Sequence, residues 1–131
     1  MSKSRLFQIH PILTAKNVVE ALSFYVNKLG FKIAFADDSK ATTYAGIRRD
    51  DIEIHIQWHD EKEWKAGFNT PMLRIVAQNV DALFEEYKDK NVYNENTKVR
   101  DTEWGTREFA FYDLYNNGLT FYQDLQIKRR V

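Results

Sequence analysis

The chain has 131 residues, of which 44% are hydrophobic and 15% aromatic, enough for one domain with a core and too few for two independent domains. Its 19 basic and 19 acidic residues cancel, so it lacks the basic balance typical of proteins that bind nucleic acid. The absence of cysteine excludes disulfides, a thiol nucleophile and thiolate metal ligands. No apolar segment has the length of a signal peptide core or a membrane span, and we expect a cytoplasmic protein.

The first half of the chain predicts a strand, a helix and three further strands. Pro11 lies in the first strand, and because proline has no backbone donor it indicates an edge or bulge position. Asn17 can accept hydrogen bonds from the first turn of the helix, and Gly30 supplies the left-handed residue that ends it. The expected strands cover residues 6–13, 31–36, 42–47 and 51–58.

The strand at residues 51–58 alternates strictly between apolar and polar side chains, which is typical of a strand with two different faces. One face is expected to pack on the core and the other to meet polar groups or solvent. The apolar face carries Ile52, Ile54, Ile56 and Trp58, and the polar face carries Glu53, His55 and Gln57.

The second half begins with a charged connector at residues 59–69. Trp64 and Phe68 stand out in it, because large rings in a polar loop must pack beneath it, contact a partner or cover a site. A strand at residues 71–77 then leads into a helix capped by Asn79. We expect a loop with a strand fragment at residues 91–106, and closing strands at 108–112 and 119–125 around a turn at 113–118.

An internal repeat relates the two halves of the chain. Residues 10–18 recur 62 positions later as residues 72–80, and in both copies an Asn-Val pair stands where a helix is expected to begin. This pattern indicates a duplicated module, and two equivalent halves imply a cleft shared between them. The first module covers about residues 5–58 and the second about 70–125, within a single domain of residues 1–131.

Several short motifs occur in order along the chain, at residues 11–15, 24–25, 29–31, 44–51, 104–110 and 113–118. Together they resemble the bleomycin resistance proteins of the glyoxalase, bleomycin resistance and extradiol dioxygenase superfamily, over residues 7–125. The resemblance implies an α+β fold in which two paired βαβββ modules form curved mixed sheets around a cavity. It also implies a homodimer, often with the N-terminal strand exchanged between subunits, and binding crevices at the subunit interface.

Metal-dependent members of the superfamily hold their ion at four equivalent strand positions, two from each module. The repeat and the motif spacing carry these positions onto His10, His55, Met72 and Tyr122. Only the two histidines suit a catalytic divalent ion, since a thioether favours Cu(I) and tyrosine is a neutral phenol at pH 7. Glu53 is expected not to help, because it lies about 7 Å along the strand from His55. We therefore expect no metal or other cofactor, and His10 and His55 as the ligands of any metal.

The resemblance also implies a pocket with aromatic faces for the flat part of an elongated cationic drug and carboxylates for its charged end. Phe35, Tyr44 and Trp104 lie where the family has ring-stacking residues, and Arg107 and Phe109 follow Trp104 as in the family motif. The full set of expected ligand-binding residues is Phe35, Tyr44, His55, Trp64, Phe68, Trp104, Arg107 and Phe109. The carboxylates expected near the crevice are those of Asp37, Asp38, Asp60, Glu61, Glu63, Asp101 and Glu103.

The sequence thus predicts a homodimeric binding protein that sequesters a bleomycin-like antibiotic, or a similar flat amphipathic compound, without modifying it. No catalytic residue, nucleic-acid partner or membrane partner is expected. One alternative is a metal-dependent lyase, isomerase or dioxygenase that uses His10 and His55, which a stoichiometric bound ion would favour. Another is a ligand-sensing or interaction module, which loss of dimerisation without loss of ligand binding would favour.

Overall fold

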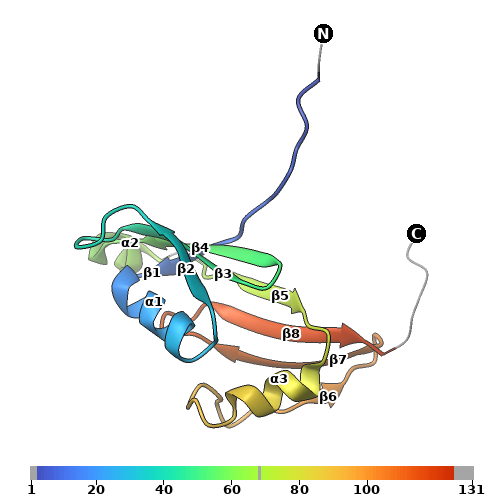
Figure 1. Ribbon diagram of the computed structural model, residues 1–131. Coiled ribbons are helices and arrows are strands. Elements are labelled where there is room, and N and C mark those ends of the chain that lie inside the picture. The colour runs from blue at the N-terminus through green and yellow to red at the C-terminus, as the bar shows by residue number, and fades with distance from the viewer. Residues whose placement is uncertain (1–2, 68, 126–131) are drawn as a thin grey trace.

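The computed structural model describes residues 3–67 and 69–125, and Figure 1 shows its elements in chain order. Each half of the chain starts with a strand and a helix that lead into further strands. The elements are β1 (Ile12–Ala15), α1 (Val18–Asn27), β2 (Lys32–Ala36), β3 (Tyr44–Arg49), β4 (Ile52–Trp58), α2 (Glu61–Ala66), β5 (Met72–Val76), α3 (Val80–Tyr87), β6 (Arg100–Asp101), β7 (Thr106–Tyr112) and β8 (Gly118–Asp124).

The strands form two sheets with the same topology. The first sheet has the order β1-β4-β3-β2 and the second has the order β5-β8-β7-β6. In each sheet the first strand of the module pairs in parallel with the last, and the other neighbours are antiparallel. The predicted α+β fold of two paired βαβββ modules is therefore confirmed.

The two main helices begin with the same cap. The side chain of Asn17 accepts a hydrogen bond from the backbone N–H of Glu20, and that of Asn79 accepts one from Ala82, both at 3.0 Å. An asparagine cap of this kind is worth about 1 kcal/mol. Gly30 follows the first helix with φ +78, the left-handed conformation that glycine adopts at little cost. The predicted caps and the glycine stop are thus confirmed.

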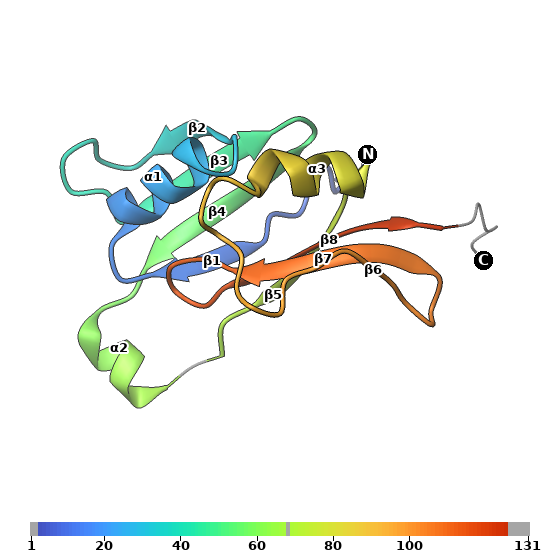
Figure 2. The same ribbon diagram turned by 90° about the horizontal axis from the view of Figure 1, so that it is seen from below.

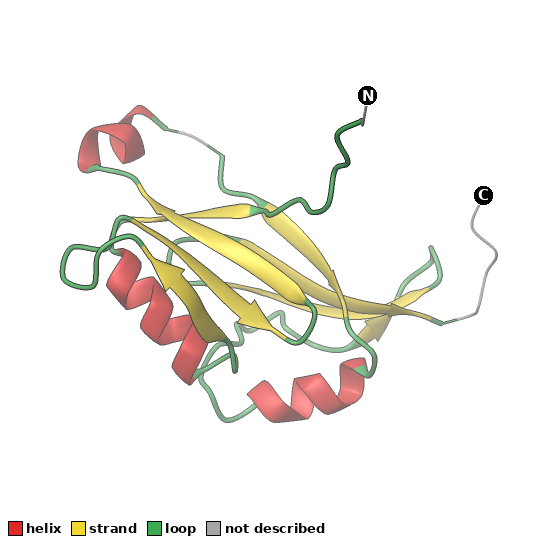
Figure 3. Cartoon of the chain, turned by 45° about the horizontal axis from the view of Figure 1, so that its top comes forward, coloured by secondary structure: helices red, strands yellow, loops and turns green. Residues whose placement is uncertain are grey.

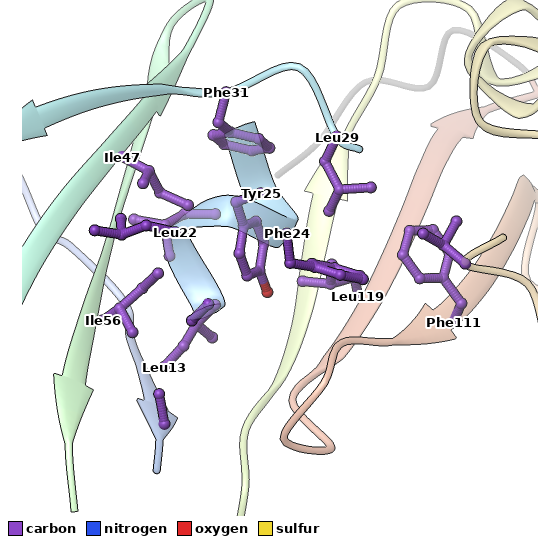
Figure 4. Packing of buried hydrophobic residues seen from close by; sticks show 14 of the residues in the cluster. Leu13, Leu22, Phe24, Tyr25, Leu29, Phe31, Ile47, Ile56, Phe111 and Leu119 are labelled. Atoms are coloured by element: carbon purple, nitrogen blue, oxygen red, sulfur yellow. The ribbon is translucent and has the colours of Figure 1, made fainter. Parts of the chain in front are cut away.

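The hydrophobic core lies between the helices and one side of the sheets. Figure 3 shows α1 and α3 on the same side of the strands. In the first module Tyr25 of α1 and Ile56 of β4 are each 1% exposed, and in the second Tyr87 of α3 meets Phe111 of β7 edge to face, with ring centroids 6.0 Å apart. Figure 4 shows buried side chains of both modules, among them Tyr25, Ile56 and Phe111. Each such side chain contributes about 1.5–3 kcal/mol by leaving water.

We call the opposite side of the two sheets the open face. Because successive side chains of a strand point to opposite sides, the alternation of β4 puts Ile54 and Ile56 in the core and Glu53 and His55 on the open face. The predicted faces of this strand are confirmed except at its end, where Trp58 is 44% exposed.

Polar side chains join the two modules. The hydroxyl of Tyr25 donates to Asp113 at 2.7 Å, and the side chain of Asn117 bonds the backbone of Thr14. Arg49 also donates from both ends of its guanidinium to Glu86, at 2.8 Å. These contacts fix one module relative to the other.

The first strand is shorter than predicted. Residues 6–13 were expected to form it, but pairing begins only at Ile12. The preceding residues 3–11 form an extended arm that leaves the body of the chain (Figure 1) and exposes Leu6, Phe7 and Ile9 by 82–99%. The apolar pattern of the arm is that of a strand, but most of the arm has no partner strand within the described chain. None of the described helices has the length and hydropathy needed to cross a membrane.

Candidate functional site

A chain of hydrogen bonds runs across the open face of the first sheet, in a group that we call the Glu53 cluster: His10, Tyr44, Arg48, Glu53 and His55. The hydroxyl of Tyr44 lies 2.8 Å from Nδ1 of His55, and Nε2 of the same ring lies 2.8 Å from Oε2 of Glu53. Arg48 donates to the other carboxylate oxygen at 2.6 Å. Register explains the grouping, because Arg48 pairs with Glu53 directly across β3 and β4.

Glu53 is the negative charge of this cluster. The hydrogen bond from His55, then that from Arg48, lowers the pKa of Glu53 from its ordinary 4.5 to about 2, so the carboxylate is ionised at neutral pH. His10 adds a weaker contact, with Nε2 at 3.5 Å from Oε2. An ionised carboxylate beside aromatic rings suits the positively charged part of a ligand.

The role of Glu53 corrects an expectation from the sequence. From the spacing along the strand, Glu53 was expected to be too far from His55 to bind the same metal ion. Side chains lean along a strand, and the two partners meet at their far ends, Nε2 of the imidazole and Oε2 of the carboxylate, at 2.8 Å. The alternation of Glu53 with His55 on one face was the signal that could have identified it.

Four rings pack in the same place. His10 stacks on His55 with centroids 4.5 Å apart, and Phe35 meets His55 edge to face at 5.1 Å. Phe35 also lies nearly parallel to Tyr44, with centroids 6.1 Å apart and 20° between the planes. Phe35 is 41% exposed, so part of this aromatic surface is available to a flat ligand. The structure thus brings together three of the predicted ligand-binding residues.

Three side chains of the cluster could together hold a metal ion. One ligand atom each from His10, Glu53 and His55 lies within 4.8 Å of the others. Two imidazoles and a carboxylate form a donor set that zinc and other divalent transition metals accept. The set comes from the first module alone, whereas the four-position arrangement implied by the resemblance needs two ligands from each module.

The second module does not complete such a site. His55 pairs with Ile12 in the first sheet, and the equivalent residue of the repeat, Arg74, pairs with Thr120 in the second. The counterpart of His55 is therefore Thr120, and the expected equivalence with Tyr122 is corrected by two residues. Met72 keeps its expected place, and its sulfur accepts from Thr120 Oγ1 at 3.4 Å.

The open face of the second sheet carries a different charge arrangement. The guanidinium of Arg74 lies 4.3 Å from the ring centre of Tyr122 and donates to Glu108 at 3.2 Å. Burial works against ionisation of Glu108, but hydrogen bonds from Thr106 and Arg74 outweigh it and lower the pKa of this carboxyl. The negative charge here is already paired within the protein.

Trp64, another of the predicted ligand residues, has partners outside the Glu53 cluster. Trp64 of α2 contacts Tyr115 and Lys16 and donates from Nε1 to the carbonyl of His59 at 3.0 Å. It therefore serves to fix α2. Phe68 lies outside the described residues.

Arg107 and Phe109 both have partners within the chain. Both alternate with Glu108, so they point to the helix side of β7. Arg107 donates to Asp81 at 3.0 Å and to Asp101 at 2.7 Å. Phe109 is 2% exposed among the core rings. The sequence does not reveal which face of β7 turns to the core, so it could not place Phe109 on the core side.

Trp104 is 59% exposed in the loop between β6 and β7, with the guanidinium of Arg100 at 5.9 Å from its ring. In Figures 1 and 2 this loop and the loop between β2 and β3, beside Phe35 and Tyr44, lie at opposite ends of the molecule. One chain therefore does not bring Trp104 to the Glu53 cluster.

Most of the loop carboxylates expected at the crevice are used locally. Asp60 and Glu63 cap α2, Asp101 pairs with Arg107, and Asp37 bonds Thr43. Glu53, a strand residue, is instead the carboxylate that lies beside the rings.

A pocket of about 960 Å³ lies between the arm, the start of β4 and β5. Its lining includes His10, Arg48 and Glu53 from the first module and Arg74 and Val76 from the second. This volume is in the range of sites for drug-sized ligands. The open faces of the two modules thus share one concave region, as the duplication predicted.

Comparison with known proteins agrees with this architecture. The chain is 31% identical to the bleomycin-binding protein of Streptomyces verticillus, whose crystal structure contains copper(II)-bleomycin, with a TM-score of 0.73 over 91% of this chain and 97% of that one. It is 24% identical to the bleomycin resistance protein of Geobacillus stearothermophilus, over 92% of this chain and 99% of the relative. The bleomycin resistance determinant of transposon Tn5 shares the fold, with 17% identity and a TM-score of 0.74 over 92% of this chain and all of that one.

The shared features extend over both modules, from the end of the arm to the last strand. The model of the Glyoxalase/Bleomycin resistance protein/Dioxygenase superfamily matches residues 8–121, which include β1 through most of β8 and every residue of the Glu53 cluster. The chain therefore belongs to this superfamily.

Proposed function

We propose that this protein sequesters a bleomycin-like compound by stoichiometric binding, without modifying it. The observation that carries the proposal is the 31% identity, over 91% of the chain, to a protein crystallised with copper(II)-bleomycin. The bleomycin resistance proteins among the relatives point the same way. These relatives favour binding over a metal-dependent lyase, isomerase or dioxygenase.

The Glu53 cluster supplies the chemistry that such binding requires. The exposed ring of Phe35, with Tyr44 and His55 beside it, offers an apolar surface for a flat ring system, and contacts of this type are typically worth about 0.5–1.5 kcal/mol beyond area burial. The ionised Glu53 attracts a cationic group. Because Arg48 is 61% exposed, it can swing into solvent and leave the carboxylate to the ligand.

The proposed binder is a cytoplasmic homodimer whose crevice is completed by the second subunit. Two features support this. The arm holds Leu6, Phe7 and Ile9 in water in the single chain, and a partner subunit would bury them. The loop between β6 and β7, which carries Trp104, lies at the other end of the molecule from the loop between β2 and β3, which follows Phe35 (Figure 2), so a site that uses both rings needs one from each subunit.

Titration with metal-free bleomycin, followed by tryptophan fluorescence and calorimetry, tests the proposal. We expect saturation at one ligand per subunit. Trp104→Ala should weaken binding by about 1–3 kcal/mol, by analogy with aromatic stacking on bases, and should remove most of the fluorescence response. Trp58→Phe, a change at an exposed tryptophan of β4, is the matched control and should keep both affinity and quenching. Absence of saturable binding to the wild-type protein would refute the proposal.

A further inference from the structure

The pairing of β2 with β3 contains an irregularity directly beside the Glu53 cluster. Ile33 pairs with Ile47, but Phe35 pairs with the next residue of β3, Gly46. Ala34 is therefore an extra residue on β2, which is the definition of a bulge. The bulge changes the side of the sheet to which the following residue points.

A regular ladder would place Phe35 elsewhere. Continued without a shift from Ile33, it would pair Phe35 with Ala45, which is fully buried on the core side. Since a shift of one residue moves a side chain to the other face, the bulge is what brings Phe35 to the open face, where it meets Tyr44 and His55.

Gly46 provides the space that the ring then occupies. A Cβ at this position would lie 2.3 Å from Cε2 of Phe35 and 2.8 Å from Cδ2, far inside van der Waals contact. The φ angle of Gly46 is outside the left-handed region, so the backbone itself does not require glycine. A glycine inside a strand lowers its stability, and here the ring of Phe35 accounts for it.

The duplicated module provides an internal comparison. Gly46 pairs with His55 in the first sheet, and Ala110 pairs with Thr120, the counterpart of His55, in the second. The same place in the second module thus accepts a Cβ. Glycine at this place is specific to the module that carries Phe35.

We propose that Gly46 and the bulge at Ala34 are positioning residues that hold Phe35 over the open face as the platform for the flat part of the ligand. The platform lies beside Glu53, to which the proposed function assigns the cationic group of the same ligand. The ligand part of this inference rests on the proposed function. The positioning part does not, and can be measured without ligand.

The binding test compares Gly46→Ala with wild type in a calorimetric titration with metal-free bleomycin. We expect Kd to rise about tenfold or more, the loss of one stacking contact, since the new Cβ displaces the ring. The exchanged pair Ala34→Phe/Phe35→Ala keeps composition and chain length, and should lose affinity similarly. Ala110→Gly, the reciprocal change at the equivalent place in the second sheet, should leave Kd unchanged.

The ligand-free test is a stability cycle. Gly46→Ala alone should lower Tm, because the ring must move. In the Phe35→Ala background the same substitution should leave Tm unchanged or raise it, since alanine is favoured over glycine in an unobstructed strand. If Gly46→Ala alone does not fold, recovery of folding in the double variant carries the same information.

NMR gives a third, direct readout. The Hα signals of Gly46 should be shifted by the ring current of Phe35 in the wild type and should return to ordinary strand values in Phe35→Leu. Wild-type Kd for Gly46→Ala, equal effects of that change in both backgrounds, or unshifted Hα signals would overturn the positioning role. Absence of bleomycin binding by the wild type would instead refute the proposed function and the assignment of the ligand, while the two ligand-free measurements would still decide the position of the ring.

Discussion

Replacing Asn117 by alanine should destabilise the whole domain, because this side chain links the two modules. Asn117 is 1% exposed. Its Nδ2 donates to the carbonyl of Thr14 at 2.8 Å, and its Oδ1 accepts from the backbone N–H and the hydroxyl of Thr14 at 3.2 and 3.3 Å. It also donates to Asp113 at 2.9 Å. At about 0.5–1.5 kcal/mol for each bond, and with water reaching the partly buried Thr14, the expected loss is about 2–4 kcal/mol.

Urea denaturation followed by far-UV circular dichroism measures this loss. The midpoint should fall while the slope with urea stays constant, since the change does not alter the surface exposed on unfolding. Asn116→Gly is the matched control: Asn116 is exposed with φ +64, a conformation glycine adopts freely, so stability should hardly change. A change below about 0.5 kcal/mol for Asn117→Ala, well under the sum of its bonds, would show that these contacts do not hold the modules together.

Two further predictions concern the Glu53 cluster. The pKa of Glu53 is lowered from 4.5 to about 2 by His55 and Arg48, so the stability that its ionised form contributes is complete above about pH 4.5 and is lost as pH falls towards 2. Glu53→Gln should therefore reduce the loss of Tm between about pH 4.5 and 2. An unchanged dependence of Tm on pH would contradict the assignment. Chelator treatment should leave the affinity for metal-free bleomycin unchanged, because the proposed binding uses rings and a carboxylate charge; an affinity lost with chelator and restored by Zn²⁺ would contradict it.

The fold could be predicted largely because local signals repeat. The Asn-Val pair marks the start of both helices, and the alternation in β4 fixes which of its residues enter the core. The sequence did not locate the start of β1, because the arm before Ile12 has the same apolar pattern as a paired strand. An apolar pattern indicates which side chains are buried, and a partner subunit can bury them as well as the chain itself can.

The candidate site was predictable only in part. Phe35, Tyr44 and His55 were expected together and lie together. The core position of Phe109 could not be predicted because it depends on the register of β7. The bulge at Ala34 was not foreseen because Ala34 carries no turn signal. The pairing of Glu53 with His55 depends on the conformations of two side chains, which strand spacing alone does not give.

The two modules have the same sheet topology, but their open faces differ in the exposure of their carboxylate–arginine pairs. Glu108 is 7% exposed in its side chain and is paired with Arg74, and a ligand that took Arg74 away would leave a buried carboxylate uncompensated, at a cost of several kcal/mol.

Glu53 also pairs with an arginine, but Arg48 lies 61% in solvent. Two histidines also lie close to this carboxylate, His55 at 2.8 Å and His10 at 3.5 Å, and neither depends on Arg48 for its contact. Exchange of Arg48 for a cationic ligand group therefore replaces one ion pair by another without burying an uncompensated charge. We therefore expect the first module to recognise the charge of the ligand, and the second to contribute a wall whose own charges are already neutralised.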